Sequence, residues 1–223
     1  MVSVLKQYVE MVDAGGTGDS ILKKIELAGR NCYKSEEKIS PESSVAFVDK
    51  ILRINHQSVL EHHNMTMRFV TDRGVLAEIT RHRLASFSVE STRYVNYSKK
   101  GMVFVLPVEY YDFENFIRTG KSTKNEPPHL FQWLNSIARA EQSYNEMIKE
   151  GASPQLSRSV LPNSLKTDIV MTMNLRNWLH MLGLRCAPSA HPQFQELAKQ
   201  ALVLCHKHVP VIFDSLHGAL LPA

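Results

Sequence analysis

The 223-residue chain has few cysteines and no long hydrophobic run. No stretch approaches the roughly 18 uncharged apolar residues of a membrane-spanning helix, so no such helix is expected. The N-terminal segment MVSVLKQYVEMVDAGG lacks a basic region followed by an apolar one and predicts no secretory signal. Cys32, Cys186 and Cys205 are odd in number and form no CxxC pair. This usage favours reduced thiols in a cytoplasmic protein.

The chain also has little excess of charge of either sign. Lysine and arginine number 26 against 22 acidic residues, which gives a net charge of +4 with histidine neutral. That excess is too small to indicate duplex nucleic acid as a partner. Apolar residues make up 43% of the chain and charged residues 22%, proportions that exclude a disordered or collagen-like chain.

Several common catalytic and nucleotide-binding motifs are missing from the sequence. Without a Walker A loop or a GxGxxG string, any nucleotide must be bound by another device. No serine lies in a GxSxG elbow, which argues against a serine hydrolase of that type. Ser91 near His82 resembles a nucleophile and its base, but the sequence places no acid to orient the histidine.

Hydrophobic periodicity predicts a mixture of helices and strands. Alternating apolar residues indicate strands near residues 65–70 and 165–173, and the apolar run at 102–106 indicates a short buried strand. Caps and apolar stripes indicate helices at 40–54 (with Ser40 as N-cap), 72–81 (with Asp72 as N-cap), 130–148 (with Gly151 as C-cap), after Asn174, at 194–205 and from Pro210. We therefore predict an α+β (mixed α/β) fold in which a central sheet is covered by long helices.

The most unusual segment is residues 80–97, TRHRLASFSVESTRYVNY, in which arginines are mixed with hydroxyl side chains. Arginine can bind two phosphate oxygens at once, and hydroxyls can satisfy the others. A solvated basic helix end with a serine-rich turn is the structural alternative. The density of polar donors through Arg93 favours a phosphate or pyrophosphate site, because such a loop has little apolar content to hold itself in place.

A second segment, residues 56–63 (HQSVLEHH), is rich in histidine and first suggests a metal. A helical metalloprotease site needs HExxH, which is missing. Adjacent Glu61 and His62 face different directions, and no cysteine nearby supplies a further ligand. We therefore expect no metal, and we interpret His56 as a site histidine or as part of a capped turn. A metal-dependent hydrolase using His56, Glu61 and His62 stays open as an alternative.

Three further positions have both a structural and a chemical interpretation. Arg158 precedes an apolar turn and would ordinarily be a surface residue. Asn174 can simply cap a helix, and Arg185 can be a favourable charge at its C-terminus. Arg185 could also lower the pKa of the adjacent Cys186 thiol, which leaves a cysteine nucleophile open.

The arginine-rich segment resembles the signature of the flavin-dependent thymidylate synthases: Arg81-His82-Arg83 is followed after seven residues by Ser91. Further matches occur in family order across most of the chain. They are His56-x-Ser58-x-x-Glu61-His62, Arg158-SVLP, Asn174-L-Arg176 with His180, and Leu184-Arg185. The resemblance implies that family's fold in a single domain over residues 1–223, and a homotetramer with active sites at subunit interfaces.

The resemblance further implies the reductive methylation of dUMP to dTMP without a cysteine nucleophile. Methylenetetrahydrofolate would be the one-carbon donor, and FAD reduced by NADPH would carry the hydride. Residues implied to bind FAD are Ser58, Arg81, His82, Arg83, Val89, Asn174, Arg176 and His180. Residues implied to bind dUMP are Glu78, Arg81, Val89, Glu90, Ser91, Thr92, Arg93, Arg158 and Arg185. His56 would lie near the flavin and folate rings, and Arg185 would be catalytic at the uracil.

Val89 departs from the family, which often has Glu or Gln at this position. A valine side chain cannot hydrogen-bond, so any contact there must be made by the backbone, and Glu90 is expected to supply the acid instead. The expected partners are small-molecule substrates, without nucleic acid or membrane, in the cytoplasm. A phosphate- or nucleic-acid-binding module built on the arginine-rich loop is the non-enzymatic alternative, and it predicts binding with a steep salt dependence.

Overall fold

Two long strands show the period-2 burial that the sequence predicts. The computed structural model describes residues 2–221, in which β3 (Asn64–Asp72) and β6 (Lys166–Asn174) each have 9 residues. Met65, Met67 and Phe69 of β3 are fully buried, whereas the residues between them are partly exposed. Since successive side chains of a strand point to opposite faces, each strand buries one face. The strands expected at residues 65–70 and 165–173 are confirmed.

Four strands form one sheet and two form another. The four-stranded sheet has the order β2-β3-β6-β4, in which β2 is Tyr8–Asp13 and β4 is Ser86–Val89. The smaller sheet pairs β1 (Ser3–Leu5) in parallel with β5 (Val103–Val105). This mixture of sheets and long helices confirms the predicted α+β fold.

The chain divides into two compact units, each built from several segments. The first unit contains the described residues through Tyr8, Val70–Arg81 and Ser88–Ile169. The second unit contains Val9–Phe69, His82–Phe87 and the described residues from Val170 onward. Strands β3, β4 and β6 contribute residues to both units.

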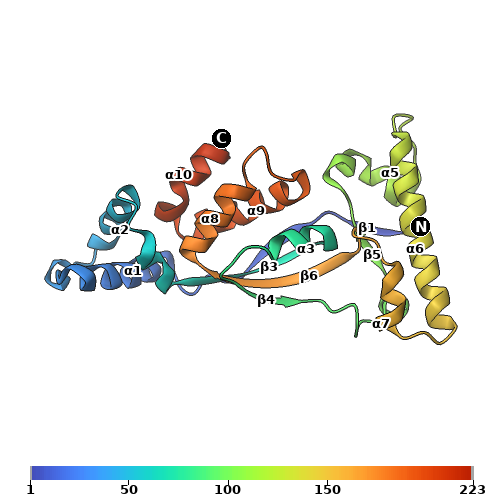
Figure 1. The fold of residues 1–223 in the computed structure, drawn as a ribbon. Helices are drawn as coiled ribbons and strands as arrows, with labels where there is room; N and C mark the ends of the chain where they lie inside the picture. The colour runs from blue at the N-terminus through green and yellow to red at the C-terminus, as the bar shows by residue number, and fades with distance from the viewer. Residues whose placement is uncertain (1, 222–223) are drawn as a thin grey trace. The chain divides into compact units, whose positions relative to one another are not determined.

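In the second unit, helices α1 (Gly18–Tyr33) and α2 (Ser43–Arg53) lie side by side (Figure 1). A Cβ on Gly29 of α1 would lie 2.5 Å from the ring of Phe47 on α2, so only glycine allows this approach. The short 3-10 helices η1 (Glu36–Lys38) and η2 (Gln57–His62) flank α2 in the sequence.

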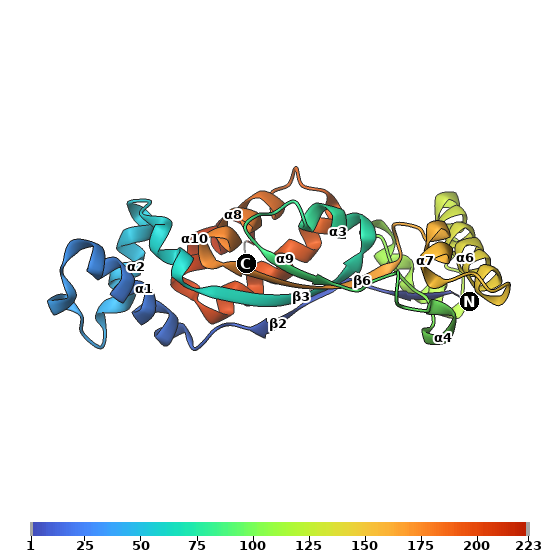
Figure 2. The same ribbon diagram turned by 60° about the horizontal axis from the view of Figure 1, so that its bottom comes forward.

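The C-terminal helices of the second unit pack together (Figure 2). They are α8 (Leu175–Arg185), α9 (Pro192–His208) and α10 (Pro210–Leu220). Trp178 of α8 packs on β3, because its indole Nε1 donates to the carbonyl of Met65 at 3.2 Å. The predicted cap is confirmed, since Asn174 Oδ1 accepts from the backbone N–H of Asn177 at 2.9 Å.

The first unit contains short helices and one long one. They are α3 (Arg73–Ile79), α4 (Tyr97–Lys100), η3 (Val108–Phe113), α5 (Glu114–Thr119), α6 (Pro128–Lys149), α7 (Pro154–Ser157) and η4 (Arg158–Val160). Asp72 caps α3 as predicted, with its Oδ1 accepting from the N–H of Val75 at 2.7 Å. Gly151 follows the α6 cap residue Glu150 with a φ of 93°, a value that favours glycine.

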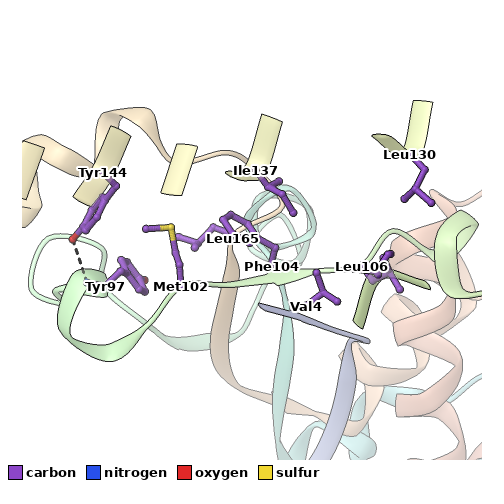
Figure 3. Close-up of a cluster of buried hydrophobic side chains, with 10 residues drawn as sticks. Val4, Tyr97, Met102, Phe104, Leu106, Leu130, Ile137, Tyr144 and Leu165 are labelled. Carbon is purple, nitrogen blue, oxygen red and sulfur yellow. Dashed lines mark hydrogen bonds between the residues drawn. The ribbon is translucent and has the colours of Figure 1, made fainter. Parts of the chain in front are cut away.

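The first unit has its own hydrophobic core, formed where α6 covers β1 and β5 (Figure 3). Its buried members are Val4, Tyr97, Met102, Phe104, Leu106, Ile117, Leu130, Ile137, Tyr144 and Leu165. Tyr144 also makes a polar contact, because its hydroxyl accepts from the N–H of Tyr97 at 3.3 Å. The core therefore fixes the chain at Tyr97, the last residue of the arginine-rich segment 80–97.

Two local predictions are wrong. The helix expected from Ser40 begins at Ser43, because the Ser43 hydroxyl binds the buried Glu26 carboxylate of α1 at 2.8 Å and accepts from the N–H of Ser40 at 2.9 Å. Residues 86–89, interpreted as part of a loop, form strand β4 at the sheet edge.

Among residues 2–221, no helix is both long and apolar enough to cross a bilayer.

Candidate functional site

A cavity of about 560 Å³ in the first unit is lined by two arginines. Arg73 and Arg158 line it together with Thr80, Val89 and Thr92, and the Thr80 hydroxyl already donates to the carbonyl of Leu76 at 3.1 Å. None of the described residues that line it is acidic. Two arginines around a cavity, with Thr92 as a further hydroxyl residue, suit an anion with several oxygens, such as a phosphate.

Separate elements bring the two arginines to this cavity. Arg73 is the first residue of α3, and its backbone N–H donates to the carbonyl of Asn163 at 2.8 Å. Its Nη1 donates to Thr167 Oγ1 of β6 at 3.4 Å. Arg158 begins η4, and its Nη1 donates to Thr92 Oγ1 at 3.4 Å.

Sequence reasoning identified Arg158 and Thr92 but missed Arg73. A signal for Arg73 was present, because it directly follows the Asp72 cap at the end of a buried strand. This position alone does not predict a site residue. Arg73 reaches the cavity because α3 lies beside residues 158–163 in the folded chain.

The turn after β4 carries three of the predicted phosphate-binding residues. Ser91 closes the turn, because its carbonyl accepts from the N–H of Val95 at 3.0 Å and its Oγ from the N–H of Arg93 at 3.3 Å. Thr92 is buried, whereas Arg93 is exposed and donates to Gln155 Oε1 at 3.1 Å. The exposed Arg93 guanidinium can therefore reach a ligand without unpacking the core.

Five of the predicted dUMP residues of this unit lie outside the lining of the cavity, namely Ser91 and Arg93 of the turn and also Glu78, Arg81 and Glu90. Glu78 lies in the last turn of α3, and Arg81 donates its N–H to the Glu78 carbonyl at 3.1 Å just beyond the helix. Glu90 follows β4, and Lys166 and Tyr97 bind its carboxylate. Their roles at the substrate stay predictions.

A second cavity, of about 390 Å³, lies in the second unit. Its lining includes three residues singled out from the sequence, His56, Ser58 and Arg176, together with Tyr33. His56 Nδ1 and the Tyr33 hydroxyl are hydrogen-bonded at 2.8 Å. Arg176 Nη1 donates to Glu61 Oε1 at 2.5 Å. The carboxylate that the metal-dependent alternative needs is thus already neutralised by a guanidinium.

Arg185 and His82 come together within the second unit although they are distant in sequence. Arg185 Nε donates to His82 Nε2 at 2.9 Å, which requires the His82 proton to be on Nδ1 in the neutral ring. The Arg185 guanidinium also lies over the ring of Phe194, 4.8 Å from its centroid. These two contacts hold the Arg185 side chain in one orientation.

Arg83, Asn174 and His180, three further predicted flavin residues, also lie in the second unit. The predicted flavin residues Arg81 and Val89 lie in the first unit. Asn174 is engaged as the cap of α8, whereas Arg83 and His180 are exposed. Asn177, which the sequence did not assign, donates from Nδ2 to the carbonyl of Leu84 at 2.8 Å. This bond connects α8 to the arginine-rich segment.

The environment of Cys186 argues against a cysteine nucleophile. The residue is 1% exposed, and burial raises the pKa of its thiol to about 11. The expectation that Arg185 lowers this pKa is wrong, because the loss of hydration outweighs any nearby cation. Burial likewise raises the pKa of Cys205, whereas Cys32 is exposed.

We expect iodoacetamide to alkylate Cys32 alone when the folded protein is treated near neutral pH. The thiolate is the reactive species, and both buried thiols are protonated there. Mass spectrometry of tryptic peptides measures the labelling, and the urea-unfolded protein, labelled at all three cysteines, is the control. Rapid labelling of Cys186 in the folded protein would contradict this assignment.

Comparisons with known proteins agree on one family. The family model described as "Thymidylate synthase complementing protein" matches residues 18–211. The flavin-dependent thymidylate synthase of Geobacter sulfurreducens is 33% identical over 204 residues, which cover 88% of this chain and 82% of that protein. The enzyme of the same name from Corynebacterium aurimucosum is 33% identical over 211 residues, covering 92% of this chain and 83% of that protein.

A solved structure has a similar fold. It is described as the UMP/dUMP methylase PolB from Streptomyces cacaoi bound with 5-Br dUMP. The TM-score is 0.77 at 23% identity, and the match covers 97% of each chain. At this identity the likeness shows the fold alone.

Proposed function

This chain belongs to the flavin-dependent thymidylate synthase family, and we propose that its two cavities take part in binding the substrate and the flavin of that enzyme. The reaction is the reductive methylation of dUMP to dTMP. Methylenetetrahydrofolate is the one-carbon donor, and NADPH reduces the FAD. The observation that carries the proposal is that the neighbouring residues Val89 and Thr92 line one cavity together with Arg158, which is 66 residues beyond Thr92, and that no described lining residue is acidic.

The cavity of the first unit takes the phosphate of dUMP. Arg158 and Thr92 of its lining supply a charge and a hydroxyl, and we add Ser91 and the exposed Arg93 from the same turn, which lie outside that lining. Val89 contributes apolar surface and its backbone, as the departure from the family pattern requires. Glu78 and Arg81, at the end of α3, and Glu90, after β4, complete the predicted dUMP set of this unit.

The residues of the second unit fit a flavin dinucleotide. Its pyrophosphate needs cations and hydroxyls, and Arg176 and Ser58 line one cavity there. Arg176 is paired with Glu61 through Nη1, so its other guanidinium N–H groups are the ones proposed to bind the pyrophosphate. His180 and Arg83 are exposed and add donors, and His56 lies in the same cavity, near the flavin and folate rings in this proposal. When bound, the reduced flavin supplies the hydride.

Arg185 is the proposed catalytic residue. C5 of uracil must become nucleophilic, and the buried Cys186 thiol does not supply the nucleophile. Arg185 instead stabilises the negative charge that develops on the N3–C2–O2 edge of the ring. The hydrogen bond to His82 and the contact with Phe194 support this role, because a preoriented donor needs no reorganisation during the reaction.

Residues 1–223 act as one catalytic domain, and four chains associate so that residues of more than one chain complete each active site. The family match supports the first statement, because it runs from residue 18 to residue 211 through segments of both units. The partners are the small-molecule substrates, and the reaction takes place in the cytoplasm. The net charge of +4 argues against a nucleic-acid partner.

An absorption spectrum of the freshly purified protein tests the proposal first. We expect the two bands of an oxidised flavin, bleaching when NADPH is added without oxygen, and dTMP once dUMP and methylenetetrahydrofolate are supplied. A colourless protein that takes up no FAD would overturn it. A stoichiometric metal together with hydrolysis that a chelator abolishes would favour the metal-dependent hydrolase. Binding of RNA or DNA with a steep salt dependence would favour the nucleic-acid-binding module.

A further inference from the structure

Glu90, the acid next to the unusual Val89, has both of its carboxylate oxygens bound within the first unit. Oε1 accepts from the hydroxyl of Tyr97 at 2.6 Å, and Oε2 accepts from Lys166 Nζ at 2.9 Å. The Tyr97 residue is 6% exposed, and the Lys166 and Glu90 side chains are 23% and 18% exposed. Each oxygen of the carboxylate therefore has a partner in the protein, within a partly buried cluster.

Lys166 connects this carboxylate to β6. Its ammonium group also binds Asp168, two residues further along the same strand. Burial alone would lower the pKa of Lys166, but its hydrogen bonds to Asp168 and Glu90 raise that pKa above its ordinary value. One lysine thus compensates two carboxylates that would otherwise repel each other.

The backbone of Glu90 is held at the same place. Its N–H donates to the carbonyl of Asp168 at 2.9 Å, so backbone and side chain both bind to β6. Glu90 directly precedes Ser91, Thr92 and Arg93, the turn that carries the proposed phosphate ligands. The position of this turn depends on where Glu90 is held.

We propose that Lys166 is a positioning residue for dUMP binding: through Glu90 it holds the turn of residues 91–93 against β6. This inference rests on the proposed function of that turn. It also changes the role of Glu90, which becomes a residue that orients the turn and does not contact the uracil or the phosphate. Tyr97 contributes the second hydrogen bond and ties the same carboxylate to the core of the first unit.

Calorimetric titration of FAD-loaded protein with dUMP tests the proposal, together with steady-state kinetics. We expect Lys166→Met to raise the Kd and KM for dUMP about tenfold, the range of a contact that acts through a neighbour, while kcat changes less than about threefold. Lys166→Arg should restore most of the affinity, because it keeps the charge. Lys149→Met, an exposed lysine at the end of α6, is the matched control and should bind dUMP as the unaltered protein does.

A double-mutant cycle separates positioning from direct contact. Glu90→Gln should raise the KM to a similar extent, and the double variant Lys166→Met/Glu90→Gln should be no worse than either single one. Unchanged dUMP affinity in Lys166→Met would overturn the proposal. So would a Glu90→Gln variant that loses kcat at saturating dUMP while Lys166→Met does not. If the unaltered protein binds dUMP but forms no dTMP, the proposed function fails, and the affinities still decide the role of Lys166.

Discussion

Replacing Arg185 by alanine is expected to lower kcat for dTMP formation at least about a hundredfold, the loss typical of one electrostatic donor to a developing charge. FAD should stay bound, because the proposed flavin ligands Ser58, Arg176 and His180 are unaltered. Arg185→Lys should recover little, since an ammonium group cannot reproduce the planar fork of the guanidinium.

Rapid-quench measurement of dTMP, combined with the flavin absorbance of the purified variant, checks this expectation. Arg53→Ala is the matched control, because Arg53 is an arginine of the same unit with a 76% exposed side chain. Full turnover by Arg185→Ala would remove Arg185 from the chemistry. Loss of both flavin and turnover would instead indicate that Arg185 and His82 mainly support the flavin site.

Replacing Arg158 by alanine is expected to weaken dUMP binding by about thirtyfold or more, because a hydrogen bond to a charged group contributes about 2 kcal/mol or more. The substitution removes one of the two guanidinium groups of the first cavity and leaves Thr92 Oγ1 without the donor it has now. Arg73→Ala should have a similar effect if the second guanidinium also faces the phosphate.

Equilibrium dialysis with radiolabelled dUMP measures the loss, and deoxyuridine, which has no phosphate, shows whether the phosphate is responsible. Deoxyuridine should bind equally weakly to the variant and the unaltered protein. Arg139→Ala, an exposed arginine on α6, is the control for charge. A variant that loses affinity for deoxyuridine as strongly as for dUMP would show that Arg158 does not bind the phosphate.

Elements with strong local patterns were predictable. The alternation of Met65, Met67 and Phe69 indicated β3, and the caps Asp72 and Asn174 fixed the starts of α3 and α8. Such signals are properties of a few consecutive residues, so they need no knowledge of the rest of the fold. The helices after Pro128 and Pro192 were found for the same reason.

Elements that depend on distant partners were not predictable. The start of α2 is decided by the bond between Ser43 and Glu26, and strand β4 exists because residues 86–89 reach the edge of the sheet. The pKa of Cys186 was predicted in the wrong direction, because its neighbour in sequence is a cation but its burial in the fold removes the hydration of the thiolate.

The sequence by itself determined the family, the α+β class and the segments in which the candidate site residues lie. The run of arginines and hydroxyl residues at 80–97 and the further family motifs can be recognised without coordinates. Only the tertiary structure decided that Arg73 joins Arg158 at one cavity and that Lys166 holds Glu90. The physical reason is that these contacts join α3 to residues 158–163 and β6 to the turn after β4. Such pairings are set by how the strands and helices pack, and no local pattern encodes them.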